Sequence, residues 1–269
     1  MADYLVTGKK GNGKSLVCVS RIRDAITQGR PIATNLDLNL VAMLGPFARN
    51  VCVVRLPDRP TIDDLEAIGR GRDGAYDESR NGLLVLDELA TWLNARSFQD
   101  KGRAAVLDWL AHSRKKGWDT YLIAQHPNQI DKQVREALCE YLVVCRRMDK
   151  LKVGPIRLPR VHVGFVRFGT ERDSPLSERW WYRGDDLFAA YDTEQVFRPV
   201  SDHGPYSMLP PWHTDGWKYE KPGLAWKLFG KLPPLNRRHQ VKPKSRAVQD
   251  AMRLRPDARL AFLRDIAQA

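Results

Sequence analysis

The chain has 269 residues, of which 43% are hydrophobic, and its 44 Lys and Arg against 32 Asp and Glu give a net charge of +12. This length suits one α/β domain with an appendage. The charge favours an anionic partner, either nucleic acid or the inner face of a membrane, or else it serves solubility alone. Because the chain shows no signal peptide and no run of the roughly 18 apolar residues that a membrane-spanning helix needs, we expect it to be soluble. The four cysteines lie in apolar segments without CxxC spacing, so we expect buried free thiols in a reducing compartment.

Short apolar runs alternate with amphipathic segments up to residue 145, a pattern typical of βαβ units and a parallel sheet. We expect strands at 4–6, 31–34, 51–56, 83–86, 121–124 and 141–145. We expect helices from the first glycine loop to Gly29, and then at 61–68, 103–115 and 129–140, with a surface loop over 69–82. The run at 83–86 contains no polar residue, which predicts a central strand covered on both faces.

The pattern changes beyond residue 150. Residues 161–168 and 179–182 predict a β-ribbon added to the core. From residue 200 onward proline and aromatic residues are frequent and periodicity is weak, and residues 237–246 are strongly basic. We therefore divide the chain into a domain over 1–200 and an irregular, basic tail over 201–269.

A glycine-rich segment near the start of the chain fits the phosphate-loop pattern G-x-x-x-x-G-K-[ST] without a gap. Glycines let such a loop curl so that its N–H groups and the positive end of the next helix face the phosphates. Lys14 is expected to reach the β and γ phosphates and the Ser15 hydroxyl to bind Mg²⁺. The sequence thus predicts an ATP and Mg²⁺ site whose nucleotide-binding residues are Gly8, Lys9, Lys10, Gly11, Asn12, Gly13, Lys14, Ser15 and Leu16.

Two acidic residues, Asp87 and Glu88, directly follow the apolar strand at 83–86. An Asp at the carboxyl end of a buried strand beside the loop would hold Mg²⁺ together with Ser15. Glu88 would then polarise the attacking water, since a partly desolvated carboxylate is a suitable general base. The alternative is that the pair only begins a helix after a core strand.

Further catalytic candidates follow from the same pattern. Gln125 ends the next buried strand, where it either senses the γ-phosphate or is an ordinary polar strand end. Arg114 lies at the end of a helix, where it either acts in trans as an arginine finger or is a solvated basic helix end; Arg135 is a weaker candidate of the same kind. The predicted catalytic set is therefore Glu88, Lys14, Gln125 and Arg114.

Several segments resemble the zonular occludens toxin (Zot) domain, the family of a filamentous-phage morphogenesis protein, namely residues 6–15, 31–37, 81–88, 112–119, 130–135 and 191–193. The resemblance covers roughly residues 3–200. It implies an additional-strand P-loop ATPase core similar to the FtsK and HerA motors, with a mostly parallel sheet flanked by helices. It also implies ATP-driven assembly and export of phage at the bacterial inner membrane, with single-stranded viral DNA as cargo.

One feature departs from this family, whose members usually carry a membrane-spanning helix after the domain. None is visible here, so either the chain ends early or it docks on a separate membrane or capsid partner. We expect a homo-oligomer, such as a hexameric ring, in the host bacterial cytoplasm and peripheral to the inner membrane.

The functional hypothesis is an ATP-hydrolysing motor for phage assembly, export or genome packaging. Its DNA contacts would come from Arg146, Arg147, Lys150, Lys152 and residues 237–246. The tail tryptophans Trp212, Trp217 and Trp226 would either stack on bases or pack the tail onto the domain.

The alternative is a small-molecule or nucleoside kinase. The adjacent Asp-Glu pair argues against it, because a kinase must avoid activating water. A GTPase is disfavoured because the guanine-reading N-K-x-D motif is absent from the sequence.

Overall fold

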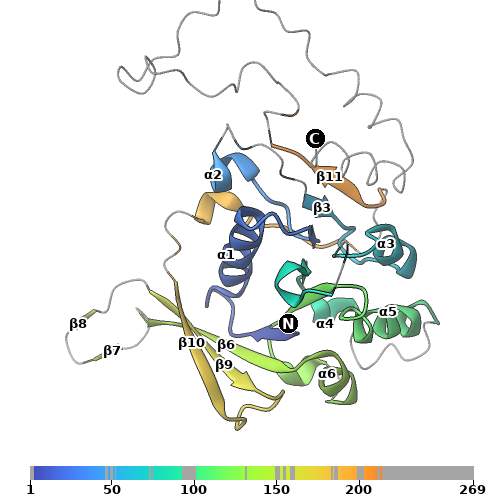
Figure 1. The fold of residues 1–269 in the computed structure, drawn as a ribbon. Coiled ribbons are helices and arrows are strands. Elements are labelled where there is room, and N and C mark those ends of the chain that lie inside the picture. The colour runs from blue at the N-terminus through green and yellow to red at the C-terminus, as the bar shows by residue number, and fades with distance from the viewer. Residues whose placement is uncertain are drawn as a thin grey trace, which may run out of the picture.

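The computed structural model describes residues 3–45, 48, 51, 53–72, 74, 76–92, 101–130, 132–148, 152–153, 156–157, 161–182, 184, 187–198, 203–210 and 213. Within them one sheet has the strand order β10-β9-β6-β1-β5-β4-β2-β3-β11 (Figure 1). Its central strands all run parallel: β6 (Tyr141–Arg147), β1 (Tyr4–Thr7), β5 (Trp118–Ala124), β4 (Gly82–Leu86), β2 (Ile32–Thr34) and β3 (Val53–Arg55). The outer strands are antiparallel to their neighbours: β9 (His162–Phe168), β10 (Leu176–Tyr182) and β11 (Tyr206–Met208).

The helices lie on both faces of this sheet (Figure 1). Helix α1 (Lys14–Thr27) covers one face, and α3 (Ile62–Ala67), α5 (Lys101–Ala111) and α6 (Lys132–Leu138) cover the other. The shorter elements are α2 (Leu40–Leu44), α4 (Leu89–Trp92), the 3-10 turns η1 (Glu78–Arg80), η2 (Pro127–Gln129) and η4 (Phe188–Ala190), and a separate ladder of β7 (Lys152–Val153) with β8 (Ile156–Arg157).

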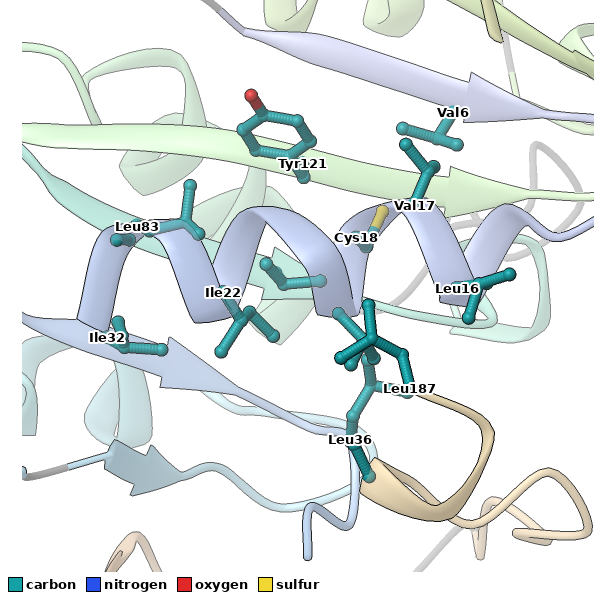
Figure 2. Packing of buried hydrophobic residues seen from close by; sticks show 14 of the residues in the cluster. Val6, Leu16, Val17, Cys18, Ile22, Ile32, Leu36, Leu83, Tyr121 and Leu187 are labelled. Carbon is teal, nitrogen blue, oxygen red and sulfur yellow. The ribbon is translucent and has the colours of Figure 1, made fainter. Parts of the chain in front are cut away.

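Each face of the sheet buries its own apolar core. Figure 2 shows α1 packing Leu16, Val17, Cys18 and Ile22 against side chains from the neighbouring strands, among them Val6, Ile32, Leu83 and Tyr121. Leu187, from the segment after β10, closes this core beside Leu36. The strand β4 is buried at all five residues, as its unbroken apolar run predicts.

The strand order confirms the predicted fold class. The strand β5 lies between β1, which leads into the glycine loop, and β4, which is followed directly by Asp87. This inserted strand is the additional strand of the predicted P-loop fold. The β-ribbon is also confirmed, since β9 pairs with β6 and β10 pairs with β9.

The described cysteines Cys18, Cys139 and Cys145 are free and buried, as expected, while Cys52 lies outside the described residues. No helix in the described part of the chain is long and apolar enough to cross a membrane.

Some expected boundaries were wrong. Helix α5 ends at Ala111 rather than at 115, because residues 112–117 form successive turns that end at Gly117, whose φ is +80°. The expected helix at 129–140 is divided into η2 and the shorter α6.

The expected surface loop at 69–82 is partly buried. Arg72 donates from Nη1 to Asn81 Oδ1 at 2.8 Å, and Asn81 donates from Nδ2 to Asp119 Oδ1 at 3.0 Å. Arg72 and Asn81 are therefore buried and bonded within the protein, which a polar composition alone does not reveal.

The strand β11 was not expected, and it pairs with β3 although residues 206–208 fall in the predicted tail. Most of 201–269, including the basic run and the tail tryptophans, lies outside the described residues. The division of the chain near residue 200 stays a prediction.

Candidate nucleotide-binding site

The glycine loop joins β1 to α1 in a conformation that only glycine adopts without strain at several points. Gly8, Gly11 and Gly13 have φ values of +153°, +74° and +84°. Gly13 is the residue before α1 and is left-handed, so the loop turns directly into the helix. The first N–H groups of α1, those of Lys14, Ser15 and Leu16, have no partner within a helix and carry its positive dipole end. The side chain of Leu16 is fully buried, which leaves only its backbone N–H for a phosphate.

Contacts with the strands β6, β9 and β10 hold this loop from outside. Asn12 donates from Nδ2 to the carbonyl of Cys145 on β6 at 3.1 Å. Tyr182 on β10 donates its hydroxyl to the carbonyl of Gly13 at 3.1 Å. The ring of His162 on β9 lies against Gly13, where a Cβ would come within 2.5 Å of its Cδ2, and it stacks on Tyr182.

These supports were not predicted from the sequence. The contacts of His162 and Tyr182 depend on the antiparallel register of β6, β9 and β10, and the contact of Asn12 depends on the parallel register of β1 with β6. The one available signal was the aromatic and histidine content of the ribbon strands, which does not reveal which residue meets the loop.

Asp87 lies at the carboxyl end of β4 and contacts the loop directly. Ser15 donates from Oγ to Asp87 Oδ2 at 2.9 Å, although the two residues are 72 positions apart. Asp87 is buried, and this burial raises the pKa of its carboxyl, while hydrogen bonds from the Glu88 N–H and from Ser15 work in the opposite direction.

Ser15 and Asp87 are hard oxygen donors of the kind that Mg²⁺ prefers. No group of three or more His, Cys, Asp or Glu able to hold a metal occurs in the described residues. A Mg²⁺ ion here would therefore take its other ligands from phosphates and water, as it usually does.

Glu88 follows Asp87 in a strained backbone conformation. Its φ is +54°, which is uncommon for a residue with a side chain and typically costs roughly 1–3 kcal/mol. Its N–H donates to Asp87 Oδ1 at 2.6 Å, and its carbonyl accepts from the N–H and the hydroxyl of Thr91. The residue is half-buried and immediately precedes α4, so both predicted interpretations, a water-activating base and the start of a helix, fit its position.

Gln125 lies beside the loop. It follows β5, and its carbonyl accepts from the N–H of Gly8 at 3.4 Å, while its side chain is exposed. Because β5 lies between β1 and β4, Gln125 follows the strand between the loop and Asp87, and its role in sensing the γ-phosphate stays a prediction.

The predicted arginine candidates lie away from the site of their own chain. Arg114 precedes β5, at the amino-terminal edge of the sheet and opposite the glycine loop, where its guanidinium lies 3.4 Å from Glu78 Oε1. Arg135 is buried on α6 and donates to Glu171 Oε1 at 2.8 Å. Arg135 is therefore held by a contact within its own chain, whereas Arg114 is exposed at the edge of the sheet opposite the loop.

The family model of zonular occludens toxin (Zot) matches residues 2–164 of the chain. The chain belongs to the Zot family. The Gene 1 protein of Enterobacteria phage fd is 48% identical over 236 residues, which cover 82% of this chain and 67% of that protein. The Gene 1 protein of Salmonella phage IKe is 47% identical over 233 residues, which cover 80% of this chain and 63% of that protein.

A solved structure, the N-terminal domain of zonular occludens toxin from Neisseria meningitidis, is 20% identical with a TM-score of 0.42 and covers 71% of this chain and 100% of its own. Membership of the Zot family rests on the family model and on the phage relatives. Together with the strand order and the loop, it makes this chain a P-loop NTPase.

Proposed function

We propose that this Zot-family chain is an ATPase that couples ATP hydrolysis to the movement of viral DNA or the extrusion of the virion at the inner membrane of a bacterial host. The contact between Ser15 Oγ and Asp87 Oδ2 carries the proposal, because it joins the phosphate loop to the acidic strand end. The relatives are phage proteins, which supports a role in the phage life cycle.

Each residue of the site has its own role in the proposed hydrolysis. The loop N–H groups and Lys14 bind and orient the phosphates, and Lys14 offsets the charge that develops on them. Ser15 and Asp87 would hold Mg²⁺, which when bound neutralises charge on the phosphate oxygens. Glu88 accepts a proton from the attacking water.

A kinase would use the same loop but would need to exclude water. The glutamate at position 88 follows the buried Asp87 directly and is half-exposed, a position suited to a water molecule rather than to a buried acceptor group. Hydrolysis is therefore favoured over transfer to a small molecule.

We propose that the ATPase works as a homo-oligomeric ring, in which Arg114 of one subunit serves the site of the next. Its side chain is 63% exposed and bonds only weakly to Glu78 and to Tyr76 at the surface, so a neighbouring subunit can compete for it. We also propose a membrane or capsid protein as the docking partner, because the Zot-family resemblance implies assembly at the inner membrane.

The test is the rate of ATP hydrolysis, with ATP binding measured separately. Lys14→Ala is expected to weaken binding and to lower turnover by about 100-fold or more. Glu88→Gln is expected to bind ATP as the wild type does and to lose turnover by roughly 100-fold, the usual contribution of a general base. The controls are Lys115→Ala and Glu136→Gln, which make the same changes at exposed positions outside the site. Normal turnover in both site variants would overturn the proposal.

A second measurement addresses the motor. The specific ATPase rate should rise with protein concentration if a ring forms, and it should rise again when single-stranded DNA is added. A rate that is independent of both would leave an ATPase that is not a ring-forming DNA motor.

A further inference from the structure

A basic pocket of about 550 Å³ lies against the outer side of the phosphate loop. Four arginines line it: Arg146 and Arg147 from the end of β6, Arg167 from β9, and Arg172 from the turn that follows β9. Among the described residues, no Asp or Glu lines this pocket. A pocket lined by four guanidinium groups suits an anion, and planar guanidinium groups match phosphate oxygens particularly well.

The pocket also contains an aromatic ring. Phe165 on β9 lines it, and the guanidinium carbon of Arg146 lies 5.7 Å from the centroid of that ring. Arg167 is fixed by a hydrogen bond from Nη1 to the carbonyl of Ser174 at 2.7 Å, so part of its charge is already oriented. Proteins that bind single-stranded nucleic acid usually combine positive charge along the sugar–phosphate backbone with aromatic rings on which the bases stack.

The pocket shares its wall with the phosphate loop. Gly8, Lys9 and Asn12 line it, and the Asn12 side chain bonds to the carbonyl of Cys145, the residue before Arg146. Val144 lies on the sheet face that α5 and α6 cover, opposite α1, and it lines the pocket with its cross-strand partner Phe165. A ligand in the pocket therefore touches the outer side of the loop whose helix end faces the nucleotide phosphates.

We propose that this pocket binds single-stranded nucleic acid, with phosphodiesters among the arginines and one base stacked on Phe165. The bound nucleic acid then contacts the loop that binds ATP. A change in the conformation of this loop during hydrolysis therefore changes the affinity of the pocket for the nucleic acid. This coupling rests on the proposed ATPase function, whereas the binding itself does not. Asn12 is the positioning residue that joins the loop to β6.

The experiment measures the affinity of the whole chain for a fluorescent oligothymidylate, without ATP, at several salt concentrations. Arg146→Gln and Arg172→Gln are each expected to weaken binding and to reduce the slope of log K against log salt by about 0.7, the value for one single-strand phosphate contact. Phe165→Leu, which keeps an apolar side chain, is expected to lower affinity about tenfold with an unchanged salt slope. The control, Arg80→Gln, removes the same charge from a residue exposed at the opposite edge of the sheet and should leave both quantities unchanged.

Competitors and ATP binding separate the alternatives. Inorganic tripolyphosphate should displace the oligonucleotide only weakly, and a DNA duplex of the same length should bind less tightly. If tripolyphosphate competes fully and Phe165→Leu has no effect, the pocket is a bare phosphate site and the proposal is wrong. If Arg146→Gln and Phe165→Leu weaken the binding of a labelled ATP analogue and not that of the oligonucleotide, the pocket is part of the ATP site. This result also overturns the proposal. The affinity for the oligonucleotide is measured without ATP hydrolysis. A chain that binds the oligonucleotide as expected but does not hydrolyse ATP would therefore refute the proposed function and still support the proposed binding pocket.

Discussion

The side chain of Asn35 holds the backbone of Asp87 through two hydrogen bonds. Its Oδ1 accepts from the Asp87 N–H at 2.7 Å, and its Nδ2 donates to the Asp87 carbonyl at 3.1 Å. Asn35 is fully buried and follows β2, the strand beside β4. It thereby fixes the residue that receives the hydrogen bond from Ser15. Gln195 in turn donates from Nε2 to the Asn35 carbonyl at 2.9 Å.

Replacing Asn35 by alanine is expected to damage hydrolysis more than ATP binding. The change leaves the N–H and the carbonyl of Asp87 without these partners, and each buried polar group left unsatisfied costs about 1–3 kcal/mol. We expect the free energy of unfolding in urea to fall by about 3 kcal/mol and turnover to fall at least tenfold. Asn128→Ala, at an exposed position, is the control. Equal losses in ATP affinity and turnover would show that Asn35 does not act through Asp87.

Asp87→Asn is expected to separate stability from activity. Burial raises the pKa of Asp87 in the folded chain. The charged carboxylate therefore opposes folding once the pH exceeds the pKa that Asp87 has in the unfolded chain. The neutral amide removes this effect, and the nucleotide-free variant should melt at a higher temperature at pH 7.5 than the wild type. Its Mg²⁺-dependent hydrolysis should fall about 100-fold or more. A variant that melts lower without nucleotide would mean that the Ser15 bond to the carboxylate outweighs its burial.

Local patterns in the sequence predicted the centre of the site. The loop spacing from Gly8 to Ser15 is contiguous, and Asp87 follows an apolar run that is typical of a central strand. Each of these two features is set by residues that are close together in the sequence. The meeting of Ser15 and Asp87 then followed from the geometry of parallel strands, whose carboxyl ends share one edge of the sheet.

Contacts between distant segments could not be predicted in the same way. Whether His162 or its neighbour faces Gly13 depends on the register of β9 on β6, and a shift of one residue would turn the ring to the other face. The strand β11 has only three residues, lies in the segment predicted as tail, and pairs with the distant strand β3, which no local pattern in the sequence reveals. The role of Arg114 depends on a second subunit, which a single chain does not contain.

Gly13→Ala should cost more stability than Gly29→Ala. Both glycines have a positive φ, +84° and +70°, so both substitutions carry the left-handed backbone penalty of about 1 kcal/mol. Only at Gly13 does the new Cβ also meet an atom, His162 Cδ2 at 2.5 Å, whereas nothing lies within 4 Å at Gly29. Urea denaturation should therefore show about 1–2 kcal/mol more loss for Gly13→Ala. In a double-mutant cycle, His162→Ala should recover part of that difference; strictly additive effects would exclude the steric contact as its cause.

Asp3 should make the stability of the chain fall as the pH rises from about 4 to 6. It accepts hydrogen bonds at Oδ1 from the N–H of Thr120 at 3.2 Å and from its hydroxyl at 2.6 Å. Burial nevertheless raises the pKa of Asp3 from 3.8 to about 6. Between these values the folded chain keeps a proton that the unfolded chain has lost, so deprotonation favours unfolding.

The Asp3→Asn variant tests this pH dependence, because its amide oxygen can still accept both bonds from Thr120 without carrying a charge. It should equal the wild type in stability near pH 4 and exceed it by about 2 kcal/mol at pH 7.5, a value set by the size of the shift. Urea denaturation at both pH values measures the difference, with Asp63→Asn, at an exposed position on α3, as the control. Wild type and variant curves that stay parallel across this range would show that Asp3 is charged in the folded chain at the same pH as in the unfolded one.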